Sequence, residues 1–172
     1  MKEVVDRLEG KLDYLLCATS TCGTLRGCAE YAREHRLSSR IIAVDAVGSV
    51  IFGGPKSKRL IPGHGAAVVP PLFQPGLADS TIYISDVECV IGCRRLARRE
   101  AILAGGSSGA VVMAMDKLRS QVPPDANCVM ILPDRGERYL DTIYSNEWVR
   151  QHFTEVPDLL ETNEIGPWVT AI

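Results

Sequence analysis

The sequence lacks the features that mark membrane-spanning, secreted and nucleic-acid-binding proteins. No apolar stretch approaches the roughly 20 residues that span a bilayer, and the charged start Met1–Asp6 has no apolar secretory segment. The 19 lysines and arginines nearly balance the 21 acidic residues, so the charge of −2 gives no reason to expect a nucleic acid or an anionic membrane as partner. We expect a cytoplasmic protein that binds neither, and its 172 residues suffice for a globular domain with a core.

The six cysteines contain no C-x-x-C pair. Cys17 lies in an apolar run, where cysteine behaves as a small hydrophobic residue. Cys89 and Cys93 have a spacing that could hold a metal on a helix, but no histidine or second cysteine pair lies near them in the sequence. Burial is therefore favoured over metal binding, and we expect no metal site.

Apolar runs alternate with helical patterns along the chain. The runs that predict strands are 15–18, 41–44, 81–84, 102–104 and 128–132. The patterns that predict helices are 25–32, 85–100 with the capping box Ser85–Glu88, 109–115 and 146–153. The stretch Gly48–Gly76 is rich in glycine and proline, which predicts a long irregular loop of functional importance.

This alternation predicts an α/β fold of three layers, with a mostly parallel, twisted sheet and helices on both faces. In such sheets, ligands bind at the carboxyl ends of the strands. The chemistry is therefore expected in the loops that follow Ala18, Ala104 and Leu132.

The first of these loops, Thr19–Thr24, joins an expected strand to an expected helix. Free N–H groups and the positive end of the helix dipole favour an anion at a helix start. Gly23 permits close approach and several hydroxyls can donate, so the loop suits a phosphate group. A plain helix-capping turn has the same composition, and the loop alone does not decide between the two.

The other two loops are Gly105–Ala110, which opens the expected buried helix, and Leu132–Tyr139, which follows the last expected strand. The first of these is also compatible with an ordinary capped helix start. The second, taken alone, is more typical of a polar surface turn.

The order and spacing of these motifs resemble the cysteine synthase family of fold-type II pyridoxal-phosphate enzymes. That family reads G-T-G-G-T-x-x-G where this chain has Ser20–Gly27, G-I-S-S-G-A at Gly105–Ala110 and L-P-D-S-G-E-R-Y at Leu132–Tyr139. Its I-Q-G-I-G-A loop resembles Ile61–Ala66. The resemblance covers nearly the whole chain, from about Asp13 to Tyr144.

The resemblance implies a role for each motif in binding pyridoxal 5'-phosphate. The cofactor-binding residues that it implies are Ser20, Thr21, Cys22, Gly23, Thr24, Ser107 and Gly63. The loop Ser20–Thr24 would hold the phosphate, Ser107 would hydrogen-bond the pyridine nitrogen, and Gly63 would line the pocket. A neutral hydroxyl at the ring nitrogen suits elimination and replacement at the β-carbon.

Two departures point to one branch of the family. Ser20 and Cys22 replace family glycines, and Arg135 stands where cysteine synthases usually have serine. The chain is more similar to the N-(2-amino-2-carboxyethyl)-L-glutamate synthases of siderophore and antibiotic pathways, which join O-phospho-L-serine to L-glutamate on the way to 2,3-diaminopropionate. By this resemblance, Ser20 and Arg135 are candidate substrate contacts. The alternatives are a cysteine synthase, a non-catalytic phosphate-binding remnant, and a nucleotide-binding domain of an unrelated α/β protein.

The family's Schiff-base lysine lies in an S-x-K-D/N-R motif, and none of the five lysines of this chain has that context. The resemblance therefore implies no catalytic residue in these 172 residues. Residues 1–172 are expected to be the C-terminal half of a large domain that lacks the lysine-bearing part and the small domain. The expected partners are amino-acid substrates, the missing N-terminal half and, when complete, a second copy in a homodimer.

Overall fold

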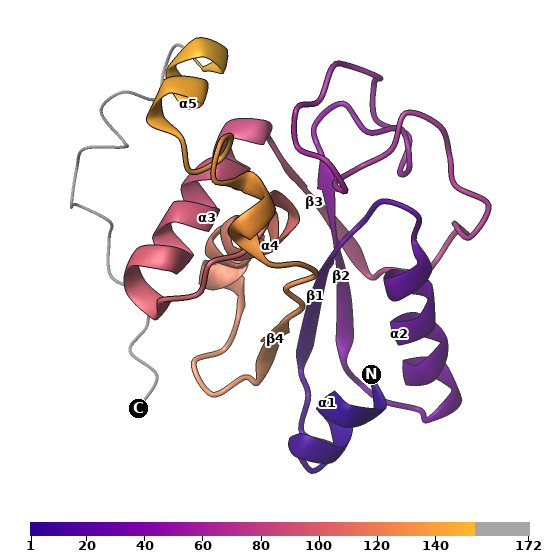
Figure 1. Cartoon of the computed structure of the whole chain (residues 1–172). Helices are drawn as coiled ribbons and strands as arrows, with labels where there is room; N and C mark the ends of the chain where they lie inside the picture. Colours follow the sequence, from indigo (N-terminus) through magenta and orange to yellow (C-terminus); the bar gives the residue numbers. More distant parts are fainter. Residues whose placement is uncertain (154–172) are drawn as a thin grey trace.

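The computed structural model describes residues 1–153, which form a single sheet between layers of helices (Figure 1). The strands are β1 (Tyr14–Ala18), β2 (Arg40–Ala46), β3 (Ser80–Ile84) and β4 (Cys128–Met130). The α-helices are α1 (Lys2–Arg7), α2 (Gly23–Glu34), α3 (Asp86–Glu100), α4 (Gly106–Leu118) and α5 (Asn146–His152). Two 3-10 helices cover Arg119–Gln121 and Gly136–Tyr139.

The strands are all parallel and lie in the order β3-β2-β1-β4. Leu16 in the centre of β1 is paired with Ile42 of β2 on one side and with Met130 of β4 on the other. Successive parallel strands need a crossover that covers one face of the sheet, and the helices supply it. The predicted α/β architecture with a parallel sheet is confirmed.

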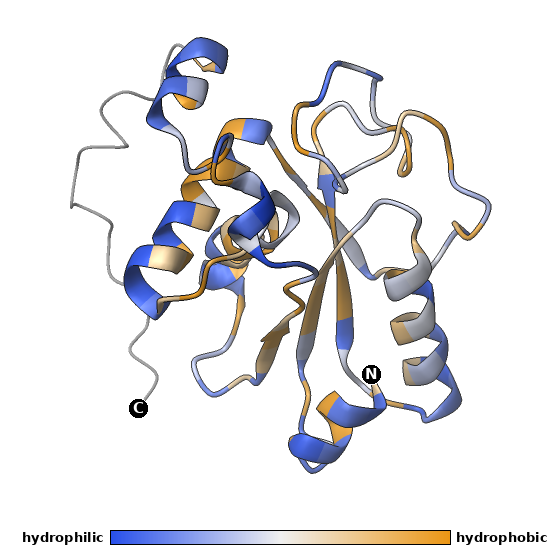
Figure 2. Cartoon of the chain, viewed as in Figure 1, coloured by the Kyte–Doolittle hydropathy of each residue, from blue (hydrophilic) through white to orange (hydrophobic). Residues whose placement is uncertain are grey.

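Successive side chains of β1 pack on opposite faces of the sheet, because side chains alternate between the two faces along a strand. Leu15 and Cys17 belong to the core beneath α2, whereas Tyr14 and Leu16 belong to the core beneath α3 and α4. Figure 1 shows α2 on one side of the sheet and the pair α3–α4 on the other. Figure 2 shows apolar strands between these helices, whose outer faces are mostly hydrophilic.

Helices α3 and α4 touch backbone to backbone through two glycines. A Cβ at Gly92 would lie 2.2 Å from the carbonyl oxygen of Gly109, and a Cβ at Gly109 would lie 2.1 Å from that of Cys89. The small, apolar pattern of 109–115 predicted a buried helix, and this prediction is confirmed. All six cysteines are free, and Cys17, Cys89 and Cys93 are buried, as predicted for these three.

The prediction of a strand at 102–104 is wrong. Only Ala104 makes a single antiparallel bridge, with Arg135, while Ile102 is 43% exposed. Ala101 ends α3 with a left-handed φ of 55°, and α4 begins directly after Gly105, which leaves no room for a strand in the sheet.

The other differences between the predicted and the observed elements are smaller. The last strand ends at Met130 rather than at residue 132, because Pro133 follows closely and has no N–H to donate. The six-residue helix α1 was not predicted. The loop between β2 and β3 is irregular, as expected. Within residues 1–153, no helix is long and apolar enough to cross a bilayer.

Candidate functional site

The loop between β1 and α2 presents an uncapped helix start at the carboxyl edge of the sheet. Cys22 is buried in a left-handed conformation with φ 65°, and α2 begins at Gly23 without a side-chain cap. The Thr21 hydroxyl accepts only a long, 3.4 Å hydrogen bond from the Gly23 amide. The amides of the first turn of α2 are thus available to an anion, as the phosphate interpretation requires.

The local packing does not itself require glycine at position 23. A Cβ there would make ordinary contacts, 3.6 Å from Leu72 Cδ1 and 3.7 Å from Thr21 Oγ1, and the backbone φ is not positive. Close approach by a ligand is the reason for glycine that the family resemblance supplies. The residues present fit the phosphate end of the cofactor.

The loop is fixed at its first residue by a buried carboxylate. Thr19 donates from Oγ1 to Asp45 Oδ1 at 2.9 Å and from its amide to the Val44 carbonyl at 2.9 Å. Burial raises the pKa of Asp45, and hydrogen bonds from Ser49, Thr19 and the Ala46 amide oppose the rise. Asp45 was not predicted as part of the site, although an acidic residue directly after the apolar run 41–44 is a detectable signal.

The second and third motifs form one unit. The Gly105 amide donates to the Asp134 carbonyl at 3.1 Å, and a Cβ at Gly105 would lie 2.2 Å from Asp134 Oδ1. Ser107 is buried, with Oγ 3.5 Å from Asp134 Oδ1. The Tyr139 hydroxyl donates to Asp134 Oδ2 at 2.6 Å, and this bond raises the pKa of Tyr139 to about 12. The start of α4 is therefore held by the turn at Asp134.

Arg135 follows Asp134 directly, but its side chain lies in solvent. Its side chain is 89% exposed, and Nη1 lies 3.9 Å from Glu137 Oε1. Such an exposed pair contributes little to stability. In this chain, the guanidinium is free to meet a ligand from outside but touches none of the other candidate residues, so its substrate role stays a prediction.

The loop Ile61–Ala66 connects the two parts of the site. The Gly65 amide donates to the Thr19 carbonyl at 2.7 Å, while the buried Ile61 packs against Gly106, where a Cβ would lie 2.4 Å from Ile61 Cγ2. Between these anchors, Gly63 has φ 74° and a Cβ there would meet nothing within 4 Å. Gly63 is exposed and a side chain there would meet open space, so its place beside a ligand stays a prediction.

His64 in the same loop is a buried polar residue that the sequence analysis did not single out. Its side chain is 1% exposed, and neither ring nitrogen has a hydrogen-bond partner among residues 1–153. Burial, with a smaller contribution from the charge of Arg59, lowers the pKa of His64 to about 4. The sequence did offer a signal for this residue, because the family loop has isoleucine where this chain has His64.

The fold and these contacts define a parallel α/β protein with a candidate ligand site at the carboxyl ends of its strands. No three His, Cys, Asp or Glu side chains of residues 1–153 are grouped as metal ligands. The family model described as pyridoxal-phosphate dependent enzyme matches residues 1–134. The chain belongs to this family of enzymes, which use pyridoxal phosphate.

Comparison with individual proteins gives more specific similarities than the family model does. Over 147 residues, the chain is 46% identical to an N-(2-amino-2-carboxyethyl)-L-glutamate synthase of Ralstonia nicotianae, covering 86% of this chain and 44% of the synthase. The structure matches an O-acetylserine dependent cystathionine beta-synthase from Helicobacter pylori with a TM-score of 0.77 and 33% identity, over 84% of this chain and 47% of that one. It matches an O-ureido-L-serine synthase with a TM-score of 0.78 and 28% identity, over 87% and 50%. The chain thus spans about half the length of these relatives.

Proposed function

We propose that this chain is the cofactor-binding part of a β-replacing enzyme that condenses O-phospho-L-serine with L-glutamate to N-(2-amino-2-carboxyethyl)-L-glutamate. The observation that carries the proposal is the loop Ile61–Ala66, which contacts Thr19 before α2 through Gly65 and the start of α4 through Ile61. The exposed Gly63 lies between these two contacts in the sequence. The similarity to the Ralstonia synthase supports this product, and the pair of substrates rests on the family resemblance.

The proposed roles follow from position. The amides and hydroxyls of Ser20–Thr24 would hold the phosphate, the buried Ser107 hydroxyl would hydrogen-bond the pyridine nitrogen, and Gly63 would leave room for the ring. Pyridoxal phosphate supplies an electron sink that permits replacement at the β-carbon of an amino acid. This chain's residues bind and orient that group. The lysine that moves the α-proton would come from the N-terminal part, since no lysine here has the family context.

We propose further that residues 1–172 are part of a larger cofactor-binding domain, with the N-terminal half and small domain elsewhere. The support is that the chain spans 44% of the synthase. The family resemblance supports a cytoplasmic homodimer for the complete enzyme.

With pyridoxal phosphate, the chain alone should form no stoichiometric, reducible adduct with a lysine. Lys117 is held by Glu88 Oε1 at 2.6 Å and by the Tyr83 carbonyl at 3.1 Å, and Lys11 lies just before β1, at the opposite edge of the sheet from the site. Borohydride reduction followed by peptide mapping should give weak labelling spread over exposed lysines. Pyridoxal without phosphate is the matched control and should label them equally. Full labelling of a single lysine together with turnover would refute the prediction.

The complete enzyme, reconstituted from this chain and its N-terminal part, should prefer O-phospho-L-serine with L-glutamate over O-acetyl-L-serine with sulfide. If the exposed Arg135 meets a dianionic leaving group or a glutamate carboxylate, Arg135→Ser should lower kcat/KM for the first pair by about tenfold, the value of one charge-assisted hydrogen bond. Arg138→Ser, at another exposed arginine of the same turn, is the control. A preference for sulfide would make the protein a cysteine synthase. An unchanged preference in Arg135→Ser would remove Arg135 from the explanation.

A further inference from the structure

The position of the loop Ile61–Ala66 is set from outside the loop. At its far end, the Gly65 amide donates to Thr19 and the Ala66 amide donates to Ser49 Oγ at 3.0 Å. At its near end, the anchor is the side chain of Asp86. Its Oδ2 accepts from the Leu60 amide at 2.7 Å, and its Oδ1 accepts from the Ile61 amide at 3.4 Å.

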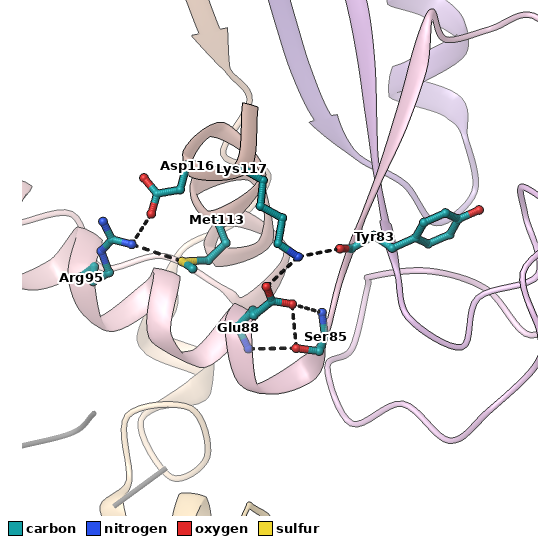
Figure 3. Close-up of polar contacts among 7 residues, drawn as sticks. All are labelled: Tyr83, Ser85, Glu88, Arg95, Met113, Asp116 and Lys117. Atoms are coloured by element: carbon teal, nitrogen blue, oxygen red, sulfur yellow. Dashed lines mark hydrogen bonds and ion pairs between the residues drawn. The ribbon is translucent and has the colours of Figure 1, made fainter. Parts of the chain in front are cut away.

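Asp86 is itself held in a rigid frame at the start of α3. Ser85 and Glu88 form a reciprocal capping box, with the Ser85 amide donating to Glu88 Oε2 at 2.8 Å. Lys117 of α4 bonds Glu88 Oε1 at 2.6 Å and the carbonyl of Tyr83 in β3 at 3.1 Å (Figure 3). Figure 3 shows this lysine joining the end of β3, the start of α3 and α4. The first turn of α3 therefore cannot shift without breaking charged contacts in two other elements.

The side chain of Ile61 transmits the position of Asp86 to the candidate site. Ile61 is 4% exposed, and its Cγ2 occupies the space that a Cβ at Gly106 would need. Gly106 directly precedes Ser107, whose hydroxyl is the proposed contact for the pyridine nitrogen. A displaced Ile61 would therefore move the loop away from Ser107 and would also shift Gly63, two residues later.

We propose that Asp86 is a positioning residue that fixes the loop Ile61–Gly65 against the start of α4 and so sets the width of the cofactor pocket. This inference rests on the proposed function. Asp86 makes no contact with Ser20–Thr24 or Ser107 that the structure records, so its effect on the cofactor passes through the loop. Its two bonds to neighbouring amides, presented from a clamped helix start, are the geometry of an anchor rather than of a solvated surface charge.

The test compares Asp86→Ala and Asp86→Asn with a matched anchor elsewhere. Asp79 Oδ2 accepts from the Ile41 amide at 2.6 Å, at the amino edge of the sheet and far from the site. Asp79→Ala therefore removes the same kind of bond without touching the loop. The readouts are amide hydrogen exchange of the 172-residue chain and its affinity for pyridoxal 5'-phosphate, measured by absorbance titration.

In Asp86→Ala, the amides from Leu60 to Gly65 should exchange at least about tenfold faster, and the affinity for pyridoxal phosphate should fall by about tenfold, because a charged acceptor of two amides is lost. Asp86→Asn keeps one acceptor oxygen and should restore part of both. Asp79→Ala should accelerate exchange at Ile41 and leave the affinity unchanged.

Two results would overturn the positioning role. One is unchanged exchange of the loop amides in Asp86→Ala. The other is a loosened loop with the affinity of the unmutated chain. If the unmutated chain itself does not bind pyridoxal phosphate, the proposed function of the site fails, and the exchange comparison between Asp86→Ala and Asp79→Ala alone decides whether Asp86 positions the loop.

Discussion

Replacing Gly109 with alanine should destabilise the chain by about 3 kcal/mol or more, the upper part of the range for overpacking a core. The added Cβ would lie 2.1 Å from the Cys89 carbonyl oxygen, 2.7 Å from the Cys93 amide nitrogen and 2.6 Å from Cys93 Sγ. Two of these three atoms belong to the backbone of α3, so no side-chain rotation relieves the clash. The helices must separate, and α4 lies against the central strands of the sheet.

The matched control is Gly27→Ala in α2. Gly27 is also a helical glycine, but it is exposed, and a Cβ there would meet nothing within 4 Å. Alanine should stabilise this position by about 0.5–1 kcal/mol, because it restricts the unfolded chain more than glycine does. Urea unfolding followed by circular dichroism measures both changes. Equal midpoints for the two variants would show that α3 and α4 are not in backbone contact.

The chain should lose about 3 kcal/mol of stability through His64 as the pH falls from about 6.5 to about 4. Because burial lowers the pKa of His64 to about 4 in the fold, only the unfolded chain takes up the proton in this window. The stabilising effect of keeping His64 neutral is therefore present above pH 6.5 and is lost as the pH falls. The raised pKa of Asp45 acts in the opposite direction and offsets part of the loss.

His64→Ile isolates this effect, since isoleucine occupies the position in the family loop. The variant should show a flatter dependence of the free energy of unfolding on pH between 4 and 6.5, measured by urea titrations at several pH values. The control Gly27→Ala removes no titratable group and should keep the pH dependence of the unmutated chain. A slope in His64→Ile equal to that of the unmutated chain would mean that the ring is protonated in the fold.

Sequence patterns correctly predicted the elements that have a clear apolar run or a capping motif at their start. The apolar runs at β1 and β2 and the capping box at Ser85 predicted the sheet centre and the start of α3 correctly. The run 102–104 failed because three apolar residues do not specify a strand unless the sheet has an open place for them. Its place in the tertiary structure decided that segment, since within residues 1–153 Arg135 is the only bridge partner of Ala104.

The candidate site, too, could be predicted from the sequence only in part. The loops after Ala104 and Leu132 were expected at the same edge of the sheet, and the bond from the Gly105 amide to the Asp134 carbonyl does bring them together. That they bind a ligand there stays a prediction. The hydrogen bonds of Asp45 and Asp86 and the burial of His64 were not predicted. Each depends on which residues distant in sequence meet in space: Asp86 binds amides that precede it by more than twenty residues, across the loop that joins β2 to β3.

The strand order has a consequence for how the chain folds during synthesis. β1 lies between β2 and β4 in the sheet. β2 follows β1 closely in the sequence, whereas β4 is far away, so that Tyr14 of β1 is paired with Cys128 of β4. Closing a loop of that length costs about 4 kcal/mol of chain entropy before the pairing stabilises anything. On the ribosome, β1, α2, β2 and β3 can assemble first, while the second edge of β1 keeps its backbone groups unpaired until Cys128 has emerged. Throughout that interval the nascent chain carries an apolar edge on which chaperones or other chains can act.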